Sequence, residues 1–196
     1  MRNKKRRAEI PSVAELEQEL ERERYRARFR KTLQSTVCVL ITVAAIAILI
    51  ATLLLPVLQI YGSSMTPTLE DGDIVLSLKE ADFERQDVIA FYYNNKILVK
   101  RVIARAGEWV NIDEEGNVTV NGEPLEEPYV MEKSLGECDI QLPYQVPEGR
   151  LFVMGDHRSV SVDSRSSAVG CVAEEQIVGK LIFRIWPLSG FGQIGG

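Results

Sequence analysis

The feature that most constrains this chain is an apolar stretch at residues 37–58, whose only clearly polar members are Thr42 and Thr52. An α-helix rises 1.5 Å per residue, so about 20 such residues cross the hydrocarbon core of a bilayer. A helix of this length inside a soluble protein would keep a polar face, and this stretch has none. It therefore predicts a transmembrane helix.

The charges on the two sides of this stretch have opposite signs. Residues 1–32 carry 11 Lys/Arg and 6 Glu, a net charge of +5, and the sequence from Glu70 onward carries 12 Lys/Arg against 22 Asp/Glu, a net charge of −10. Basic flanks of a membrane span stay in the cytoplasm, so we expect a cytoplasmic N-terminus and an extracytoplasmic body over residues 59–196. The acidic body argues against nucleic acid as a partner, because phosphate binding requires clustered Lys and Arg.

The length of the basic head distinguishes an anchor from a cleaved leader. A secretory signal has a short charged region and an apolar stretch of about 7–15 residues. Here 32 hydrophilic residues precede a longer apolar stretch, which favours an uncleaved, single-pass anchor in the plasma membrane. Residues 1–36 form the cytoplasmic extension in this interpretation. The helix-forming segment 14–30, with its Glu-then-Arg spacing, is either solvated or binds a partner or a lipid surface.

The rest of the chain has the pattern of a mainly β domain. Short apolar runs separated by turn residues predict strands within the segments DGDIVLSL, DVIAFYY, KILVKRVIARAG, NVTVNGE, RLFVMGD and IVGKLIFRIWPL. Asn94-Asn95 and Asn121-Gly122 suit the turns of β-hairpins. Residues 123–150 are polar and contain four prolines, so we interpret them as a small inserted cap.

The cysteines and the single histidine limit the chemistry. Cys38 lies in the apolar stretch, whereas Cys138 and Cys171 could form a disulfide in an extracytoplasmic body or remain free thiols. No Cys-x-x-Cys or His/Cys cluster is present, so we expect neither a metal site nor a cofactor.

Two residues are candidates for nucleophilic catalysis. Ser64 lies in a Gly-Ser-Ser-Met-Thr-Pro segment that by itself is more typical of a turn, and a serine hydroxyl needs a base to attack a carbonyl. His157 is one possible base. Lys100, within the apolar run Ile-Leu-Val-Lys-Arg-Val-Ile, is another, because burial can lower the pKa of a lysine by several units. Alternation along a strand would point Lys100 and Arg101 to opposite faces, one inward and one solvated.

The order of four short motifs resembles that of the bacterial type I signal peptidases over residues 33–190. The chain has Ser64-Met65-Thr66-Pro67-Thr68-Leu69 behind the apolar stretch, then Asp87-Val88-Ile89-Ala90-Phe91, then Lys100-Arg101, and finally a segment from Gly155-Asp156 to Asp163-Ser164-Arg165. That family has a membrane anchor followed by a mainly β catalytic core with a smaller second domain.

The resemblance implies a role for each matched residue. Ser64 would be the nucleophile and Lys100 the general base, with Met65 packed beside the nucleophile. Ser161 would hydrogen-bond and orient the lysine, Asp163 and Arg165 would stiffen the site, and Asp156 would be a nearby structural acid. The remaining expectation is that the strand Asp87, Val88, Ile89 and Ala90 pairs with the extended substrate.

The chain departs from the family pattern at three positions. Gly62 stands where some members have a serine that helps to bind the oxyanion, so the backbone N–H of Ser64 would carry that task, with Ser63 as a further candidate. His157 replaces a usual Asn, and Gln86 replaces a common Gly.

The resemblance implies an endopeptidase that removes signal peptides from exported preproteins. Its partners would be those preproteins, membrane lipid and, transiently, the secretion machinery. Two alternatives stay open. One is a self-cleaving Ser–Lys protein like the bacterial SOS repressors, although those carry a DNA-binding domain rather than an anchor. The other is a catalytically silent anchored β-domain that binds exported chains.

Overall fold

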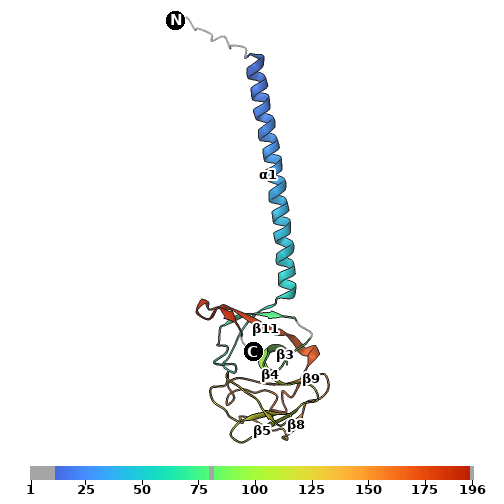
Figure 1. Ribbon diagram of the computed structural model, residues 1–196, viewed down its shortest axis with the longest axis vertical. Helices are drawn as coiled ribbons and strands as arrows, with labels where there is room; N and C mark the ends of the chain where they lie inside the picture. The colour runs from blue at the N-terminus through green and yellow to red at the C-terminus, as the bar shows by residue number, and fades with distance from the viewer. Residues whose placement is uncertain (1–11, 80–81, 195–196) are drawn as a thin grey trace. The chain divides into compact units, whose positions relative to one another are not determined.

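The computed structural model describes residues 12–79 and 82–194, apart from the side chains of residues 50–54. The chain divides into two compact units, residues 1–51 and residues 52–196. Among the described residues, the first unit is helical from Val13 onward, and every strand lies in the second (Figure 1). The predicted combination of a long apolar N-terminal helix and a mainly β body is confirmed.

Helix α1 (Val13–Leu54) is 42 residues long. It begins with a capping box, in which the backbone N–H of Ser12 donates to the Glu15 carboxylate at 2.8 Å and the Glu15 N–H donates to Ser12 Oγ at 3.4 Å. Its apolar part is long enough to cross a membrane. Residues 14–30 and the apolar stretch thus share one helix, which ends two residues before Pro56, and the last residues of the stretch form a strand instead.

The strands form two antiparallel sheets. The large sheet has the order β1-β2-β11-β3-β4-β9-β10, with β12 paired to β11, and the small sheet has the order β7-β6-β5-β8. The bounds in the large sheet are β1 (Val57–Gln59), β2 (Ile74–Leu78), β3 (Val88–Tyr93), β4 (Lys96–Ala104), β9 (Arg150–Met154), β10 (Val172–Ala173), β11 (Ile177–Trp186) and β12 (Gly192–Gln193). The small sheet comprises β5 (Trp109–Ile112), β6 (Val118–Val120), β7 (Glu123–Pro124) and β8 (Tyr144–Gln145), and two short 3-10 helices lie at Glu174–Gln176 and Leu188–Gly190.

Each of the six predicted segments contains a strand. Both predicted hairpin turns are present: Asn94 and Asn95 have φ angles of 44° and 63°, and Asn121 and Gly122 have φ angles of 56° and 83°. Two successive left-handed residues match the twist of the flanking strands, which is why Asn and Gly occur there. The small sheet extends beyond residues 123–150, because β5 and β6 precede that segment.

Three apolar clusters fix the parts of the domain that carry the motifs. The small sheet packs its Val110, Ile112 and Val118 against Phe152 and Met154 of β9, the strand that leads into the segment at Gly155. The second cluster packs the Ser64 loop against the large sheet and contains Met65, Leu69, Val75, Val88 and Ala90. The third contains Phe83, Ile89, Phe91, Val153 and Val172. Cys38, Cys138 and Cys171 are free thiols, so the possible disulfide does not form in this structure.

Candidate active site

Ser64 lies in a tight loop between β1 and β2 that several hydrogen bonds hold in place. The Gly62 N–H donates to the Asp71 carboxylate at 2.7 Å, and the Leu69 N–H donates to the Met65 carbonyl at 2.9 Å. The carbonyl of Ser64 itself accepts a hydrogen bond of 3.1 Å from the His157 N–H. Because Met65 is buried in the core directly after it, Ser64 has a fixed position with its side chain at the surface of a pocket.

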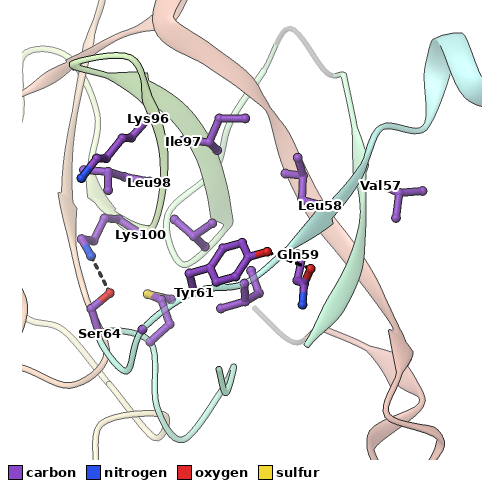
Figure 2. Close-up of a pocket in the computed structure, with 13 residues that line it drawn as sticks. Val57, Leu58, Gln59, Tyr61, Ser64, Lys96, Ile97, Leu98 and Lys100 are labelled. Atoms are coloured by element: carbon purple, nitrogen blue, oxygen red, sulfur yellow. Dashed lines mark hydrogen bonds between the residues drawn. The ribbon is translucent and has the colours of Figure 1, made fainter. Parts of the chain in front are cut away.

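Lys100 reaches this serine from the middle of β4. Its Nζ lies 2.7 Å from Ser64 Oγ, within hydrogen-bonding distance, although 36 residues separate the two in the sequence (Figure 2). The lysine side chain is buried, with only 4% of its surface exposed. The structure therefore brings the two residues of the predicted pair into contact.

The pKa of Lys100 is lowered from its ordinary value of 10.5, and the largest cause is burial. A buried ammonium group loses its hydration, which disfavours the charged form. Arg165 lowers the pKa further, whereas the negative charges of Asp163 and Asp156 oppose the shift. A larger fraction of Lys100 is thus neutral, and able to accept a proton, than of a solvated lysine.

Asp163 and Arg165 form a buried ion pair behind the lysine. The Arg165 guanidinium donates to both Asp163 carboxylate oxygens at 2.8 Å, and Asp163 also accepts a hydrogen bond of 2.9 Å from the Gly155 N–H. Arg165 donates further to the backbone carbonyls of Leu135, Arg158 and Ser161. A charge pair with its remaining hydrogen bonds satisfied is rigid, so it fixes the path of the 155–165 segment.

Arg101 and Asp156 form a second buried pair. Two guanidinium nitrogens lie 2.9 Å and 2.7 Å from the two Asp156 oxygens, and Thr68 Oγ1 donates to Asp156 at 2.5 Å. The Tyr129 ring stacks on the Arg101 guanidinium, 3.8 Å from ring centroid to Cζ. The prediction that one residue of the Lys100-Arg101 pair is solvated was therefore wrong, because β4 is buried on both faces at these two residues and Arg101 pairs with the Asp156 carboxylate.

Ser161 lies at the expected place without the expected hydrogen bond. Its Oγ is buried and has no hydrogen-bond partner among the described residues. Gly155 permits its close approach, since a Cβ at that glycine would stand 2.3 Å from Ser161 Oγ and 2.5 Å from the Ser64 carbonyl oxygen. The hydroxyl thus points into the crowded region between Gly155 and the Ser64 loop, but it does not bond to Lys100 in this structure.

A pocket of about 540 Å³ opens at Ser64 and Lys100. One wall is the segment from β1 to the nucleophile and the other is the first half of β4; the lining residues are Val57, Leu58, Gln59, Ile60, Tyr61, Gly62, Ser64, Met65, Lys96, Ile97, Leu98, Val99 and Lys100 (Figure 2). Apart from the reacting pair and Lys96, these side chains are mostly apolar, so the pocket suits small apolar groups.

Both walls present unpaired strand edges to the pocket. β1 is the terminal strand of the large sheet and pairs with β2 alone, while β4 pairs with β9 only from Arg101 onward, so its residues 96–99 have one free edge. Unpaired backbone N–H and C=O groups at an edge can accept an added strand. The pocket can therefore hold an extended peptide by its main chain.

The prediction for the substrate strand at 87–90 needs correction. β3 pairs with β4 along one side and with β11 along the other, so it has no free edge. Val88, Ile89 and Ala90 are buried core residues and Asp87 forms an ion pair with Lys180 at 2.8 Å. The continuous apolar run of this segment reflects a central strand buried on both faces, and the exposed edge belongs to the neighbouring β4.

The loop before the nucleophile offers one backbone donor. No described residue accepts a hydrogen bond from the Ser64 N–H, whereas the N–H of Gly62 is occupied by Asp71. The Ser63 side chain is exposed, and its carbonyl accepts a hydrogen bond from Thr66. His157 does not contact Ser64 Oγ through its ring; its Nδ1 lies 3.0 Å from Thr66 Oγ1.

Sequence reasoning missed two groups of residues at this site. The first is Glu127, whose carboxylate pairs with the fully buried Arg158. The second is the pocket wall formed by β1. Glu127 resembles its exposed acidic neighbours in sequence, and β1 begins within the apolar stretch. Neither could be identified without knowledge of the tertiary contacts. Among the described residues, no group of three or more His, Cys, Asp or Glu side chains could hold a metal ion.

Comparison with known proteins agrees with the motifs and the site. The family described as "Signal peptidase, peptidase S26" matches residues 33–186. The chain is 38% identical over 153 residues to signal peptidase IB of Staphylococcus aureus, an alignment that covers 67% of this chain and 78% of that protein. It is 34% identical over 161 residues to the chloroplastic thylakoidal processing peptidase 1 of Arabidopsis thaliana, covering 74% of this chain and 46% of that longer protein.

A crystal structure of a signal peptidase I from Enterococcus faecalis is also similar, with a TM-score of 0.42 and 30% sequence identity over 51% of this chain and 97% of that one. The chain belongs to the signal peptidase family, peptidase S26. This family consists of serine endopeptidases that act on preproteins bearing signal peptides, and the resemblance first suggested by four short motifs is thereby confirmed.

Proposed function

We propose that this chain removes N-terminal signal peptides from exported preproteins, with Ser64 as nucleophile and Lys100 as general base. The observation that carries the proposal is the 2.7 Å contact between Lys100 Nζ and Ser64 Oγ at the end of a pocket with two free strand edges. A base must lie within hydrogen-bond reach of the proton that it takes, and this lysine does. Burial also lowers its pKa, as the role requires.

In the proposed reaction, Ser64 Oγ attacks the carbonyl carbon of the scissile bond while its proton passes to neutral Lys100. The Ser64 N–H, which has no other acceptor among the described residues, donates to the oxyanion that forms. Lys100 then protonates the leaving amine, and the mature protein departs. Water, deprotonated by the same lysine, releases the signal peptide as a carboxylate and restores Ser64.

The substrate lies between β1 and the first half of β4 in this proposal. An extended segment there adds a strand to either edge, so its main chain provides affinity. The pocket has about 540 Å³ for the side chains that point into it, and apolar groups line most of the wall. Signal peptides end in small residues at the last and third-last positions, which fit such a pocket.

The buried network behind Lys100 positions it rather than reacting. Asp163 and Arg165 fix the segment that covers the lysine, Asp156 holds Arg101 next to it, and Ser161 fills the space beside Gly155. Met65 anchors the residue after the nucleophile in the core. Ser63 is exposed and stays a secondary candidate for contact with the oxyanion.

The domain arrangement and the membrane orientation belong to the same proposal. Residues 1–36 form a cytoplasmic extension, residues 37–58 contain the single membrane span, and residues 59–196 form the extracytoplasmic catalytic domain with a cap at 123–150. The dense Arg cluster between residues 22 and 31, which precedes the apolar part of α1, supports a cytoplasmic N-terminus in the plasma membrane. Transient contact with the secretion machinery follows from the nature of the substrate.

A trans-cleavage assay tests this function. Detergent-solubilised full-length protein should cut a preprotein at the end of its signal peptide, and Ser64→Ala and Lys100→Met should each abolish the product. Ser189→Ala and Lys133→Met, at residues outside the pocket, are matched controls that should retain activity. Binding of the preprotein without cleavage by the wild type would instead favour a silent binding domain, and activity in Ser64→Ala would exclude the assigned nucleophile.

A further inference from the structure

A second pocket lies next to the loop that carries the nucleophile. It has a volume of about 200 Å³ and is lined by Thr66, Met131, Glu132, Asp156 and His157. None of these residues lines the larger pocket between β1 and β4. One wall comes from the Ser64 loop and the 155–165 segment, and the other comes from the connection between β7 and β8, within the segment 123–150.

His157 connects this pocket directly to the reacting serine. Its backbone N–H donates to the Ser64 carbonyl at 3.1 Å, and its ring Nδ1 lies 3.0 Å from Thr66 Oγ1 and 3.3 Å from the Ser63 carbonyl oxygen. The pocket thus begins within two residues of Ser64. Because an extended chain advances about 3.3–3.6 Å per residue, the first few residues beyond a bond held at Ser64 can reach it.

The position of the larger pocket indicates which part of the substrate reaches the second pocket. Its free edges at β1 and β4 take the residues that precede the cleaved bond, since those are the small apolar residues that its walls suit. The residues that follow the bond must leave past Ser64, away from these walls. Thr66 follows Ser64 in the chain, His157 contacts both residues, and neither lines the larger pocket, so we assign the departing residues to this side of the nucleophile.

The charge of the second pocket is set by Glu132. The other carboxylate, that of Asp156, is buried and neutralised by Arg101 at 2.7 Å. Glu132 is exposed, and no described residue forms an ion pair or hydrogen bond with it. Met131 beside it is 84% exposed and offers an apolar surface. An aliphatic stem that ends in a cation, as in Lys or Arg, can pack on such a methionine while its head reaches the carboxylate.

We propose that this pocket binds the first side chains of the mature protein, on the carboxyl side of the cleaved bond, and that Glu132 makes it favour basic over acidic side chains. The proposal rests on the proposed function, because it assigns to Ser64 the bond that divides the two pockets. It makes Glu132, in the segment 123–150, a determinant of substrate choice that recognises residues on the carboxyl side of the cleaved bond.

The test compares two preproteins that are identical except for Lys or Glu at the first three mature positions. The ratio of kcat/KM for the basic and the acidic preprotein is measured with the full-length protein in detergent. For Glu132→Gln this ratio should fall about twofold to fivefold, the range typical of one exposed ion pair, and Glu132→Lys should reverse the preference. Added NaCl should reduce the wild-type ratio, as for any exposed charge pair.

Glu137→Gln is the matched control, since Glu137 is exposed in the same segment and lies outside both pockets. It should leave the ratio at the wild-type value. An unchanged ratio in Glu132→Lys, or an equal fall in Glu137→Gln, would overturn the inference while cleavage itself upholds the proposed function. Failure of the wild type to cut either preprotein would instead overturn the proposed function and this inference with it.

Discussion

Lys100 Nζ and Ser64 Oγ are 2.7 Å apart, although the lysine comes from the middle of a β-strand and the serine from a loop 36 residues earlier. The contact is possible because β4 presents Lys100 at the point where its free edge ends and its pairing with β9 begins. The same strand thus provides a base, a wall of the pocket and an edge for the substrate.

The pH dependence of activity should report the titration of Lys100. Because burial lowers its pKa, kcat/KM should rise with pH through an apparent pKa below 10.5, the ordinary value for lysine. Lys100→Arg should be inactive at every pH, since a guanidinium stays protonated. Measuring preprotein cleavage from pH 5 to 11 checks both expectations. If a Lys100 variant retains some activity and its kcat/KM still rises with pH through the same apparent pKa, the titrating group is not Lys100.

Lys100→Met should stabilise the protein at neutral pH. The folded-state pKa of Lys100 lies below its unfolded value, so between these two values the unfolded chain binds more protons and wild-type stability rises with pH. Each unit of pKa depression costs the wild type about 1.4 kcal/mol at pH values below both. In detergent, the variant should therefore have a higher Tm than the wild type at pH 7. The difference between the two Tm values should shrink as the pH rises toward 10.5. A lower Tm for the variant at pH 7 would show that the burial of Lys100 does not destabilise the folded protein.

Gly155→Ala should disable the site without removing the fold. The added Cβ would stand 2.5 Å from the Ser64 carbonyl oxygen, and since this contact is to backbone, the Ser64 loop must move. A displacement of 1 Å can reduce the rate about 100-fold, so kcat should fall by about that factor while circular dichroism stays unchanged. Gly192→Ala is the control, because nothing lies within 4 Å of a Cβ there. Equal activity of the two variants would contradict the close packing at Gly155.

Main-chain pairing with one of the two free edges predicts an alternating response to backbone N-methylation. Alternate residues of a strand direct their N–H groups to the same neighbour, so methylation at every second position before the cleaved bond should be harmful. Loss of one hydrogen bond corresponds to a reduction in kcat/KM of about 2-fold to 12-fold. A series of synthetic peptides methylated one position at a time measures this. A uniform loss would indicate pairing with both edges, and no loss at any position would argue against strand addition.

Much of the fold could be predicted because its signals are local. The apolar stretch, the six strand segments and the Asn-containing turns each depend on neighbouring residues, and the structure contains them all. The pair of Ser64 and Lys100 could be predicted only from the order of the motifs. Neither residue differs locally from an ordinary turn serine or an ordinary strand lysine.

The errors concern contacts between distant residues. Arg101 was expected at the surface if Lys100 was buried, but its partner Asp156 lies 55 residues further along the chain and makes burial favourable. The substrate strand was placed on β3 because the sequence does not reveal which strands are central. That distinction depends on β11, which pairs with β3 from near the end of the chain and leaves the free edge to β4.

The identity of the nucleophile is tested most directly by trapping the acyl-enzyme. Wild-type protein is mixed with a peptide substrate, quenched in acid at early times, digested and examined by mass spectrometry. The account predicts a fragment containing Ser64 whose mass is increased by the acyl portion of the substrate, and no such fragment in Ser64→Ala. An acyl group on any other residue, or substrate cleavage that persists in Ser64→Ala, would contradict it.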